Sequence, residues 1–363
     1  MLLRDNNFDL IGLIAAIQVF VMHAVAWLKL SVPPVFMEVV DWFPGVPIFF
    51  VISGYLVTAS SARSPSTVQF FRNRALRILP GLWACLIVTF FIVALRDGLP
   101  ESNLLLKTLA WFIANGSIFQ FVGDVGTGVV NGALWSISTE AQFYLLIPLV
   151  VVLSVFFRGR KAQATATLFV LMCISGLIHQ WVLANSSTLH PWIFQVVYPS
   201  ILANGYFFLM GVLAYIWRDQ LIPLVRARLI VFLGLYIVVR MFLLDADYTV
   251  DVVHSTMLGV AVYLFLGLTI FAAAHTAEGV SRWLLRGHDF SYGLYIYHMP
   301  VIYALIHHQL FGAAGMGLAS VLVGFCAVVS WFAVEKPALG YKHYSVQQAG
   351  GLASYGKPTN EAQ

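Results

Sequence analysis

Apolar stretches long enough to cross a lipid bilayer recur along the whole chain. The hydrocarbon core of a bilayer is about 30 Å thick, so a helix that rises about 1.5 Å per residue needs about 20 apolar residues to span it. Stretches of roughly this length lie near residues 8–30, 44–61, 76–96, 134–157, 165–184, 198–217, 228–246, 254–274, 289–310 and 315–334. Because lipid offers the backbone no hydrogen-bond partners, each stretch must satisfy its own N–H and C=O groups as a helix. The sequence therefore predicts an all-α, polytopic membrane protein with about ten transmembrane helices.

The composition agrees with a membrane protein. Of the 363 residues, 60% are hydrophobic and only 10% are charged, which lies outside the range of soluble globular domains. The formal net charge of +4 is small, so no nucleic-acid partner is predicted. Only Arg4 precedes the first apolar stretch as a basic residue, which predicts a signal anchor that stays in the membrane. The three cysteines lie within apolar stretches without metal-ligand spacing, so neither a disulfide nor a metal site is predicted.

Two further segments complete the predicted organisation. The apolar segment 104–121 is interrupted by Lys107, Asn115 and Gly116, and we interpret it as a re-entrant or interfacial helix. Residues 337–363 are polar and rich in small side chains, which predicts a flexible cytoplasmic tail. The chain is therefore expected to consist of a transmembrane domain over residues 1–336 and this tail, without a soluble catalytic domain.

The distribution of basic residues tests the number of spans, because a missed span would exchange inside and outside for every later loop. With the N-terminus in the cytoplasm, ten spans put sixteen of the twenty Lys and Arg residues into cytoplasmic segments. The others, on or near the outer side, are Lys29, Arg96, Lys107 and Arg240. This excess satisfies the positive-inside rule and predicts cytoplasmic N- and C-termini.

Ionisable side chains inside predicted spans are costly in lipid and are therefore candidates for function. They include His23, Glu140, Arg240 and His298. For a single histidine, a neutral imidazole bonded to a neighbouring helix is an equally good interpretation. His23 lies about 22 Å above the inner end of its span and Glu140 about 9 Å below the outer end of its own, so the two share a depth. The shared depth predicts an acid–base pair in which the carboxylate orients the imidazole.

Polar and amphipathic side chains are dense around Glu140, in the stretch LWSISTEAQFY. Helical spacing puts Ser136 and Tyr144 on the same stripe as Glu140. The flanking faces carry Trp135, Ser138 and Gln142. Serines that bond to backbone carbonyls and a tryptophan that anchors a helix end are the alternative interpretation. The density of these groups favours a cavity lined for substrate.

Small and basic residues near the second and third spans form another candidate set. Ser53 and Gly54 lie in the middle of the second span, where small residues usually indicate close helix packing and ligand binding is the alternative. Arg72, Arg74 and Arg77 lie at the cytoplasmic mouth of the third span. They are interpreted either as charges that set the topology or as a clamp for phosphate groups, which suit the planar guanidinium.

Six motifs occur in one order along the chain: FDLIGLIAAIQVFVMHA, GVPIFFVISGYL, RNRALRILP, LWSISTEAQFYLLIPL, FSYGLYIYHMP and VEKP. Together they resemble the bacterial membrane acyltransferase-3 family of O-acyltransferases, over about residues 5–340. The resemblance implies a ten-helix, multi-pass enzyme of the bacterial inner membrane, of the carbohydrate O-acetyltransferase type. It implies transfer of an acyl group, commonly acetyl, from cytoplasmic acyl-CoA to a hydroxyl of a cell-surface or lipid-linked carbohydrate, with no permanently bound cofactor.

The resemblance also implies catalytic roles. His23 matches the essential histidine of the family's first helix and is expected to act as the general base, and Glu140 matches the carboxylate of the LWS-type motif. Family members usually carry an arginine at the position of Gly12, so this chain departs from the pattern there. The two positions are eleven residues apart, about 16 Å along one helix face. We expect the arginines before the third span to hold the donor without that charge; an altered donor and an impaired activity are the alternatives.

The remaining predicted site residues bind the two substrates. Arg74 and Arg77 match the family's basic pair before the third span and, with Arg72, are expected to hold the phosphates of acyl-CoA, near Ser53 and Gly54. The residues expected to line the acceptor side are Trp135, Ser136, Ser138, Gln142, Tyr144, Tyr292 and His298.

Two other functions stay open at the level of sequence. A proton-coupled transporter or a flippase of a lipid-linked sugar would use His23 and Glu140 as a proton relay, although the chain shows no pair of pseudo-symmetric halves. An inactive relative of the family is the second alternative, which Gly12 favours. The acceptor sugar, the acyl group and the oligomeric state are left open.

Overall fold

The computed structural model describes residues 6–97, 104–117, 131–156, 160–243 and 257–342, and the regular elements in these residues are all helical. A helix lies at each of the predicted spans. These helices are α1 (Phe8–Trp27), α3 (Gly45–Arg63), α4 (Thr67–Asp97), α6 (Trp135–Phe156), α7 (Lys161–Ala184), α9 (Ile201–Ile216), α11 (Leu229–Leu243), α13 (Met257–Ala274), α15 (Ser291–His307) and α16 (Gly312–Ser330). The all-α prediction is therefore confirmed for the part of the chain that the structure describes.

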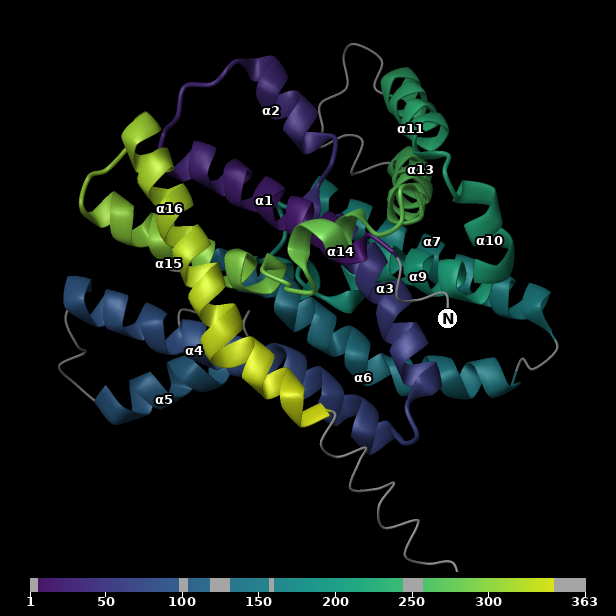
Figure 1. The fold of residues 1–363 in the computed structure, drawn as a ribbon, viewed down its shortest axis with the longest axis horizontal. Coiled ribbons are helices and arrows are strands. Elements are labelled where there is room, and N and C mark those ends of the chain that lie inside the picture. The colour runs from purple at the N-terminus through teal and green to yellow at the C-terminus, as the bar shows by residue number, and fades with distance from the viewer. Residues whose placement is uncertain (1–5, 98–103, 118–130, 157–159, 244–256, 343–363) are drawn as a thin grey trace, which may run out of the picture.

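Shorter helices connect the long ones. They are α2 (Pro34–Asp41), α5 (Leu104–Asn115), α8 (Pro191–Val197), α10 (Arg218–Val225) and α14 (Val280–Leu285). The 12 residues of α5 rise only about 18 Å, which is too little to cross a bilayer. α5 lies beside α4 (Figure 1), where the rings of Phe112 and Trp83 stack with centroids 6.0 Å apart. This agrees with the interpretation of segment 104–121 as a helix that does not span, and residues 118–121 lie outside the described residues.

Many of the helices have the length and hydropathy of membrane spans. Within the described residues, six helical segments are long and apolar enough to cross a membrane, and the bent pair α10–α11 would make a seventh. The helices α10 and α11 meet at an angle of 94°, so this pair is either a broken span or a re-entrant loop. The chain is thus consistent with a polytopic membrane protein, whereas ten crossings and the cytoplasmic position of both termini stay predictions.

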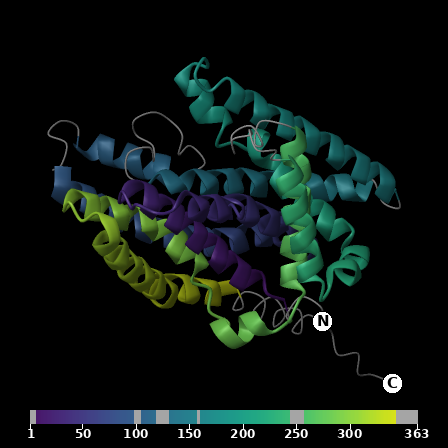
Figure 2. The ribbon, with the colours of Figure 1, turned by 90° about the horizontal axis from the view of Figure 1, so that it is seen from above.

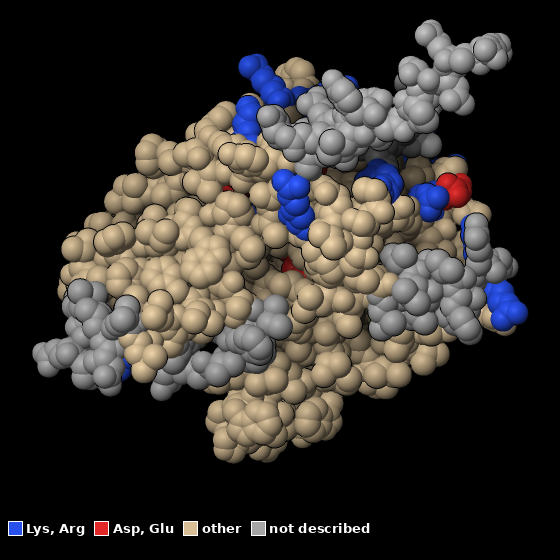
Figure 3. Space-filling view, turned by 90° about the horizontal axis from the view of Figure 1, so that it is seen from below, with Lys and Arg blue, Asp and Glu red and all other residues tan. Residues whose placement is uncertain are grey.

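The longer helices are arranged around α1, α3 and α15. Figures 1 and 2 show α1 and α4 running roughly along the long axis of the molecule, with α16 packed against α15 on one side. The helices α11 and α13 pack on each other and cross the others at the opposite end. Figure 3 shows basic side chains along one part of this face, one of them beside a hollow in which a small acidic patch is visible. This arrangement leaves a space between α1, α3, α4, α6 and α15 that the candidate site occupies.

Glycines let α3 and α9 approach until their backbones touch. A Cβ atom added to Gly54 would lie 2.9 Å from the carbonyl carbon of Phe208 and would overlap its oxygen. From the other side, a Cβ on Gly211 would lie 2.8 Å from the Cα of Gly54. Next to this crossing, the rings of Phe50 and Phe208 stack with centroids 4.4 Å apart. Small residues at a close helix crossing are typical of membrane proteins, so Gly54 serves packing here.

The last helix extends further than the hydropathy predicts. After α16, a π-helical turn (Trp331–Glu335) leads into further helix that ends at Lys342. Glu335, which marked the end of the last predicted span, is only 2% exposed and accepts a hydrogen bond of 2.7 Å from Ser330. This carboxyl group is held inside the protein, and the helix continues through it past residue 337, the predicted start of the tail. Residues 343–363 lie outside the described residues.

A buried arginine ties α2 to α11. Arg240 is 2% exposed, forms an ion pair of 3.6 Å with Asp41, and lies with its guanidinium carbon 5.7 Å from the ring centroid of Trp42. Tyr236, one turn earlier on α11, donates its hydroxyl to the carbonyl of Trp42. The ion pair thus gives Arg240, which the charge distribution predicts on or near the outer side, an acidic partner on α2.

Candidate functional site

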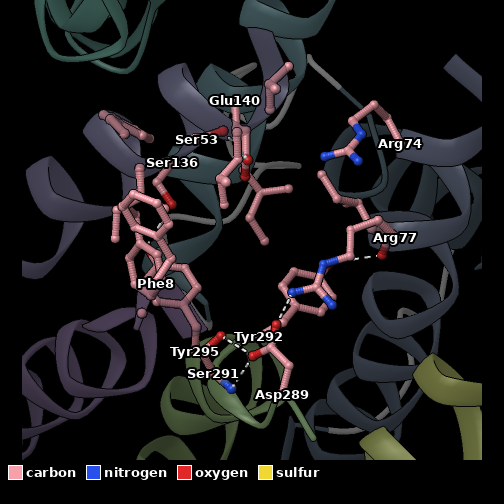
Figure 4. Close-up of a pocket in the computed structure, with 18 of the residues that line it drawn as sticks. Phe8, Ser53, Arg74, Arg77, Ser136, Glu140, Asp289, Ser291, Tyr292 and Tyr295 are labelled. Atoms are coloured by element: carbon pink, nitrogen blue, oxygen red, sulfur yellow. Dashed lines mark hydrogen bonds and ion pairs between the residues drawn. The ribbon is translucent and has the colours of Figure 1, made fainter. Parts of the chain in front are cut away.

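A cavity with a volume of about 170 Å³ lies between α1, α3, α4, α6 and α15. Apolar side chains, among them Phe8 and Phe49, form much of its wall. Its polar lining residues are Asp9, Ser53, Arg74, Arg77, Ser136, Glu140, Tyr144, Asp289, Ser291, Tyr292 and Tyr295. Figure 4 shows the two arginines on one side of this cavity and Ser53, Ser136 and Glu140 on the other. A concave site that combines apolar walls with convergent polar groups is typical of small-molecule binding.

The two arginines of α4 differ in their pairing. They lie three residues apart, so helical spacing directs both towards the cavity. Arg77 forms an ion pair with Asp289. The guanidinium of Arg74 lies 5.9 Å from the ring centroid of Tyr144 and makes one long hydrogen bond, 3.4 Å, to Ser60. The Nε of Arg74 is buried without a hydrogen-bond partner among the described residues. Arg74 therefore keeps donor capacity for an anionic ligand, whereas the charge of Arg77 is balanced.

Asp289 precedes α15 and joins it to α4. Its carboxylate accepts hydrogen bonds from the backbone N–H of Ser291 at 3.1 Å and from the Ser291 hydroxyl at 2.5 Å. Burial by itself would raise the pKa of Asp289, but the Arg77 guanidinium and the two bonds from Ser291 outweigh it and hold this pKa below its usual value. Asp289 is therefore an anion at neutral pH, and it fixes Arg77 at the rim of the cavity.

Glu140 offers one free carboxylate oxygen to the cavity. Ser53 of α3 donates a hydrogen bond of 2.7 Å to its Oε1, and Tyr144, one turn further along α6, donates one of 2.5 Å to the same oxygen. Both of these bonds go to Oε1, so Oε2 takes part in neither of them. The carboxylate is thus oriented by two hydroxyls and retains acceptor capacity for a ligand.

Hydroxyl groups from α15 close the cavity between α4 and the start of α6. The Tyr292 hydroxyl donates to the carbonyl of Ile78 at 2.8 Å. The Tyr295 hydroxyl donates to the carbonyl of Ala133 at 2.8 Å and lies 2.7 Å from the Oγ of Ser136. These bonds attach α15 to α4 and to the start of α6, so the tyrosines shape the cavity wall.

The predicted pair of His23 and Glu140 does not form. The Nδ1 of His23 lies 2.9 Å from the Nε2 of His298, whereas Glu140 bonds to Ser53 and Tyr144. Two groups at one depth meet only when their helices turn them towards each other. Here α1 packs closely on α15, which brings His298 to His23, and α6 turns Glu140 towards α3. Neither histidine lines the cavity, but His298 follows the cavity residue Tyr295 by one turn of α15.

The predicted binding residues divide into two groups. Ser53, Arg74, Arg77, Ser136, Glu140, Tyr144 and Tyr292 line the cavity, and their roles in binding or catalysis stay predictions. Arg72 is exposed on α4 and lies outside the lining, and Gly54 lies against α9. On α6, Gln142 accepts a hydrogen bond of 3.0 Å from the backbone N–H of Ile201, and Trp135 packs on Phe50 with centroids 6.0 Å apart. Ser138 is buried outside the lining. These four polar or aromatic residues and Gly54 serve helix packing or face solvent.

The cavity also contains residues that the sequence did not single out as site residues. Asp9, in the first turn of α1, lines the cavity. It could have been found from sequence, because an ionisable residue within a predicted span is a candidate for function. Asp289 and Ser291 have the spacing of a turn before a helix. Gly12 lines the cavity too, and a Cβ there would make ordinary contacts of 3.7 Å with Phe49 and Ser291. The cavity does not continue along the α1 face to His23.

Comparison with known proteins gives long matches. The chain is 29% identical over 360 residues to nodulation protein 10 of Rhizobium leguminosarum bv. viciae, a match that covers 92% of this chain and 93% of that protein. It is 27% identical over 344 residues to an O-acetyl transferase of Shigella phage Sf6, with 92% and 96% covered. It is 25% identical over 288 residues to O-acetyltransferase OatA of Staphylococcus aureus, covering 72% of this chain but only 46% of OatA. No solved structure matches the chain.

A family model supports the same relationship. The acyltransferase-3 model, described as an acyltransferase domain, matches residues 5–335. This range includes every residue that lines the cavity, and also His23 and His298. The match and the apolar helices together indicate a multi-pass membrane protein. The chain therefore belongs to the acyltransferase-3 family.

Proposed function

We propose that this protein is a membrane-bound O-acyltransferase that moves an acyl group, most simply acetyl, from acyl-CoA to a hydroxyl of a cell-surface or lipid-linked carbohydrate. The O-acetyltransferase names of two relatives support this reaction. The observation that carries the proposal is that the acyltransferase domain encloses a cavity with arginines on one side and a carboxylate on the other. We place the protein in the bacterial inner membrane with ten crossings and cytoplasmic termini, so that the arginines open towards cytoplasmic acyl-CoA.

Arg74 is the group proposed to bind the phosphates of the donor. Its guanidinium has no carboxylate partner among the described residues and keeps a buried, unpaired Nε. A planar guanidinium binds phosphate with two parallel hydrogen bonds, which a partner carboxylate would otherwise occupy. Arg77 is balanced by Asp289 and would hold the wall in place. The proposal therefore assigns the donor to Arg74 in the absence of an arginine at position 12.

His23 is proposed as the general base. Its Nε2 would take the proton of the acceptor hydroxyl while that oxygen forms a bond to the thioester carbonyl carbon and the carbon–sulfur bond breaks. The sulfur leaves as the coenzyme A thiolate, and the proton on His23 returns to it or to water. His298 lies one turn of α15 beyond Tyr295 at the cavity edge, so its partner His23 lies near the end of the space that would hold the acyl group.

Glu140 is proposed to act inside the cavity rather than on His23. Its Oε1 is occupied by two hydroxyls, and its Oε2 is free to accept an N–H from the amide-containing arm of the donor. An oriented carboxylate would hold that arm so that the thioester points towards the histidines. This role replaces the predicted one, in which Glu140 orients the base.

Mass spectrometry of surface carbohydrates tests the reaction. Cells with the wild-type gene should yield carbohydrates heavier by one acyl group than cells without it, and the mass difference identifies the acyl group. Cells with His23→Gln at equal protein level should resemble cells without the gene. Full acylation by His23→Gln would refute the base, and no mass difference in wild-type cells would refute the enzyme.

Binding of acetyl-CoA by the purified protein tests the donor. A ligand that binds only the folded state raises the unfolding temperature with its concentration. Wild-type protein in detergent should be stabilised by acetyl-CoA, and Arg74→Ala should require a higher concentration for the same shift. Arg72→Ala is the matched control, because Arg72 lies on the same helix but is exposed outside the cavity. Equal shifts in all three proteins would contradict the role of Arg74.

A further inference from the structure

The hydrogen bonds of His298 define where its proton lies. The side chain is fully buried in α15, and its Nδ1 is 2.5 Å from the backbone carbonyl oxygen of Tyr295. A carbonyl oxygen only accepts hydrogen bonds, so Nδ1 of His298 must be protonated and donate. Its other nitrogen, Nε2, lies 2.9 Å from Nδ1 of His23. The proton in this second contact belongs either to His298 or to His23.

The surroundings of His298 decide between these two arrangements. Its hydrogen-bond partners are the backbone of Tyr295 and Leu294 and another imidazole, and no carboxylate among the described residues bonds to it. A doubly protonated, fully buried imidazole without an anion would carry a large desolvation cost. A neutral His298 with its proton on Nδ1 presents a bare lone pair at Nε2. Nδ1 of His23 is therefore the donor in the contact between the two rings.

The ring geometry supports a directed hydrogen bond. The two imidazoles are nearly parallel, with an interplanar angle of 13° and centroids 5.0 Å apart. Parallel rings in face-to-face contact cannot bring atoms closer than about 3.5 Å. The 2.9 Å between the nitrogens of His23 and His298 thus runs mainly within the ring planes, where the N–H bond and the lone pair lie.

We propose that His298 is a positioning residue for His23: it accepts the proton of His23 Nδ1 and so keeps Nε2 of His23 unprotonated and able to act as a base. The chain of bonds runs from His23 through His298 to the carbonyl of Tyr295. His23 is only partly buried, and its Nε2 has no hydrogen-bond partner among the described residues. These hydrogen bonds would also hold the His23 ring in place when its Nε2 takes a proton. The catalytic consequence rests on the proposed function, whereas the proton positions do not.

Nitrogen NMR of the full-length protein in lipid vesicles tests the proton positions directly. The probe is uniformly ¹⁵N-labelled histidine, and the His23 signals are assigned by their loss in His23→Gln. His23 should show a protonated Nδ1 and an unprotonated Nε2 at neutral pH. The leucine side chain of His298→Leu cannot accept a hydrogen bond. In that variant His23 should therefore no longer be held in the one tautomer that is protonated on Nδ1. A wild-type His23 protonated on Nε2 would overturn the proposal, whatever the protein catalyses.

Acyl transfer by the same variants tests the consequence. His298→Leu should lower the rate by roughly 10- to 100-fold, within what general acid–base catalysis contributes. His298→Gln should restore most of the rate and the Nδ1-protonated tautomer of His23, because an amide can donate to the Tyr295 carbonyl and accept from His23. His307→Leu, on the exposed end of the same helix, is the control and should change neither. If His298→Gln fails like His298→Leu while both unfold at the wild-type temperature, the positioning role is refuted. If His23→Gln acylates normally while the NMR result holds, the proposed base is refuted and the tautomer stands.

Discussion

Adding one methyl group at the crossing of α3 and α9 should destabilise the protein without touching the cavity. In Gly54→Ala, the new Cβ would lie 2.9 Å from the carbonyl carbon and 3.0 Å from the Cα of Phe208. Ordinary contacts begin at 3.4 Å, and the obstacle is backbone, which no side-chain rotation can clear. The overlap with the carbonyl oxygen of Phe208 is deeper still, so the two helices must separate by roughly 1 Å, which loosens the aromatic packing around Phe50. Overpacking of this kind costs about 1–3 kcal/mol.

The measurement is thermal unfolding in detergent at one fixed heating rate, because unfolding of such proteins is often irreversible. With about 2–4 °C per kcal/mol, Gly54→Ala should unfold roughly 2–12 °C below wild type, and Gly211→Ala should behave similarly. The double variant should lose less than the sum, because the two positions contact each other. The matched control is Gly324→Ala in α16, where an added Cβ meets nothing within 4 Å and alanine favours the helix.

Two outcomes would refute this reasoning. One is a Gly54→Ala protein that unfolds at the wild-type temperature, and the other is an equal loss in Gly324→Ala. Acetyl-CoA binding separates packing from ligand contact. If Gly54 serves packing alone, Gly54→Ala should bind acetyl-CoA as wild type does well below its unfolding temperature. A large loss of affinity with unchanged stability would restore the interpretation of Gly54 as a binding residue.

Three further substitutions have defined expectations. Asp289→Asn should lower stability at neutral pH by roughly 2–4 kcal/mol, because Arg77 loses its partner, and thermal unfolding measures the loss. Since the pKa of Asp289 is held below its usual value, this contribution is present above the unfolded pKa near 4 and is lost as pH falls through the lower folded pKa, so the difference from wild type should shrink in acid. Asp41→Asn should lower the stability of the folded protein by about 3–5 kcal/mol, because Arg240 is left buried without an anion. An Asp41→Leu, Arg240→Met double variant that is no more stable than Asp41→Asn would contradict this. Glu140→Gln keeps an acceptor oxygen but removes the charge. The rate of acyl transfer should therefore fall at least about tenfold, while the unfolding temperature stays near that of wild type. An unchanged rate would argue against a role for the carboxylate.

Hydropathy predicted the helices well because helix formation in lipid is a local requirement. Each apolar stretch must satisfy its own backbone, whatever its neighbours are. The errors occur where charged side chains find partners within the protein. Glu335 ends the apolar run, yet it is buried against Ser330 and the helix continues through it. α4 likewise begins at Thr67, ahead of its apolar run, and its first turns carry the arginines.

Part of the candidate site could also be read from sequence. The stripe of Ser136, Glu140 and Tyr144 follows from helical spacing within one element, and all three line the cavity. The same spacing places Arg74 and Arg77 on one side of α4. Gln142 and Trp135 lie on the flanking faces and pack against α9 and α3. The sequence shows that these faces are polar or amphipathic, but the neighbour that each face meets is a tertiary property.

The chain by itself determined where the helices lie and which family the protein belongs to, and it predicted at what depth the ionisable groups sit. Depth alone does not define which groups a side chain contacts. The contacts also depend on how its helix is rotated about its axis and on which helix lies beside it. Only the tertiary structure decided that His23 meets His298 rather than Glu140, and that Arg77 is paired with Asp289 while Arg74 is not. The physical reason is that helix formation depends on contacts within a few residues, whereas these pairings join helices far apart in sequence whose packing is set by the shapes of all the side chains between them.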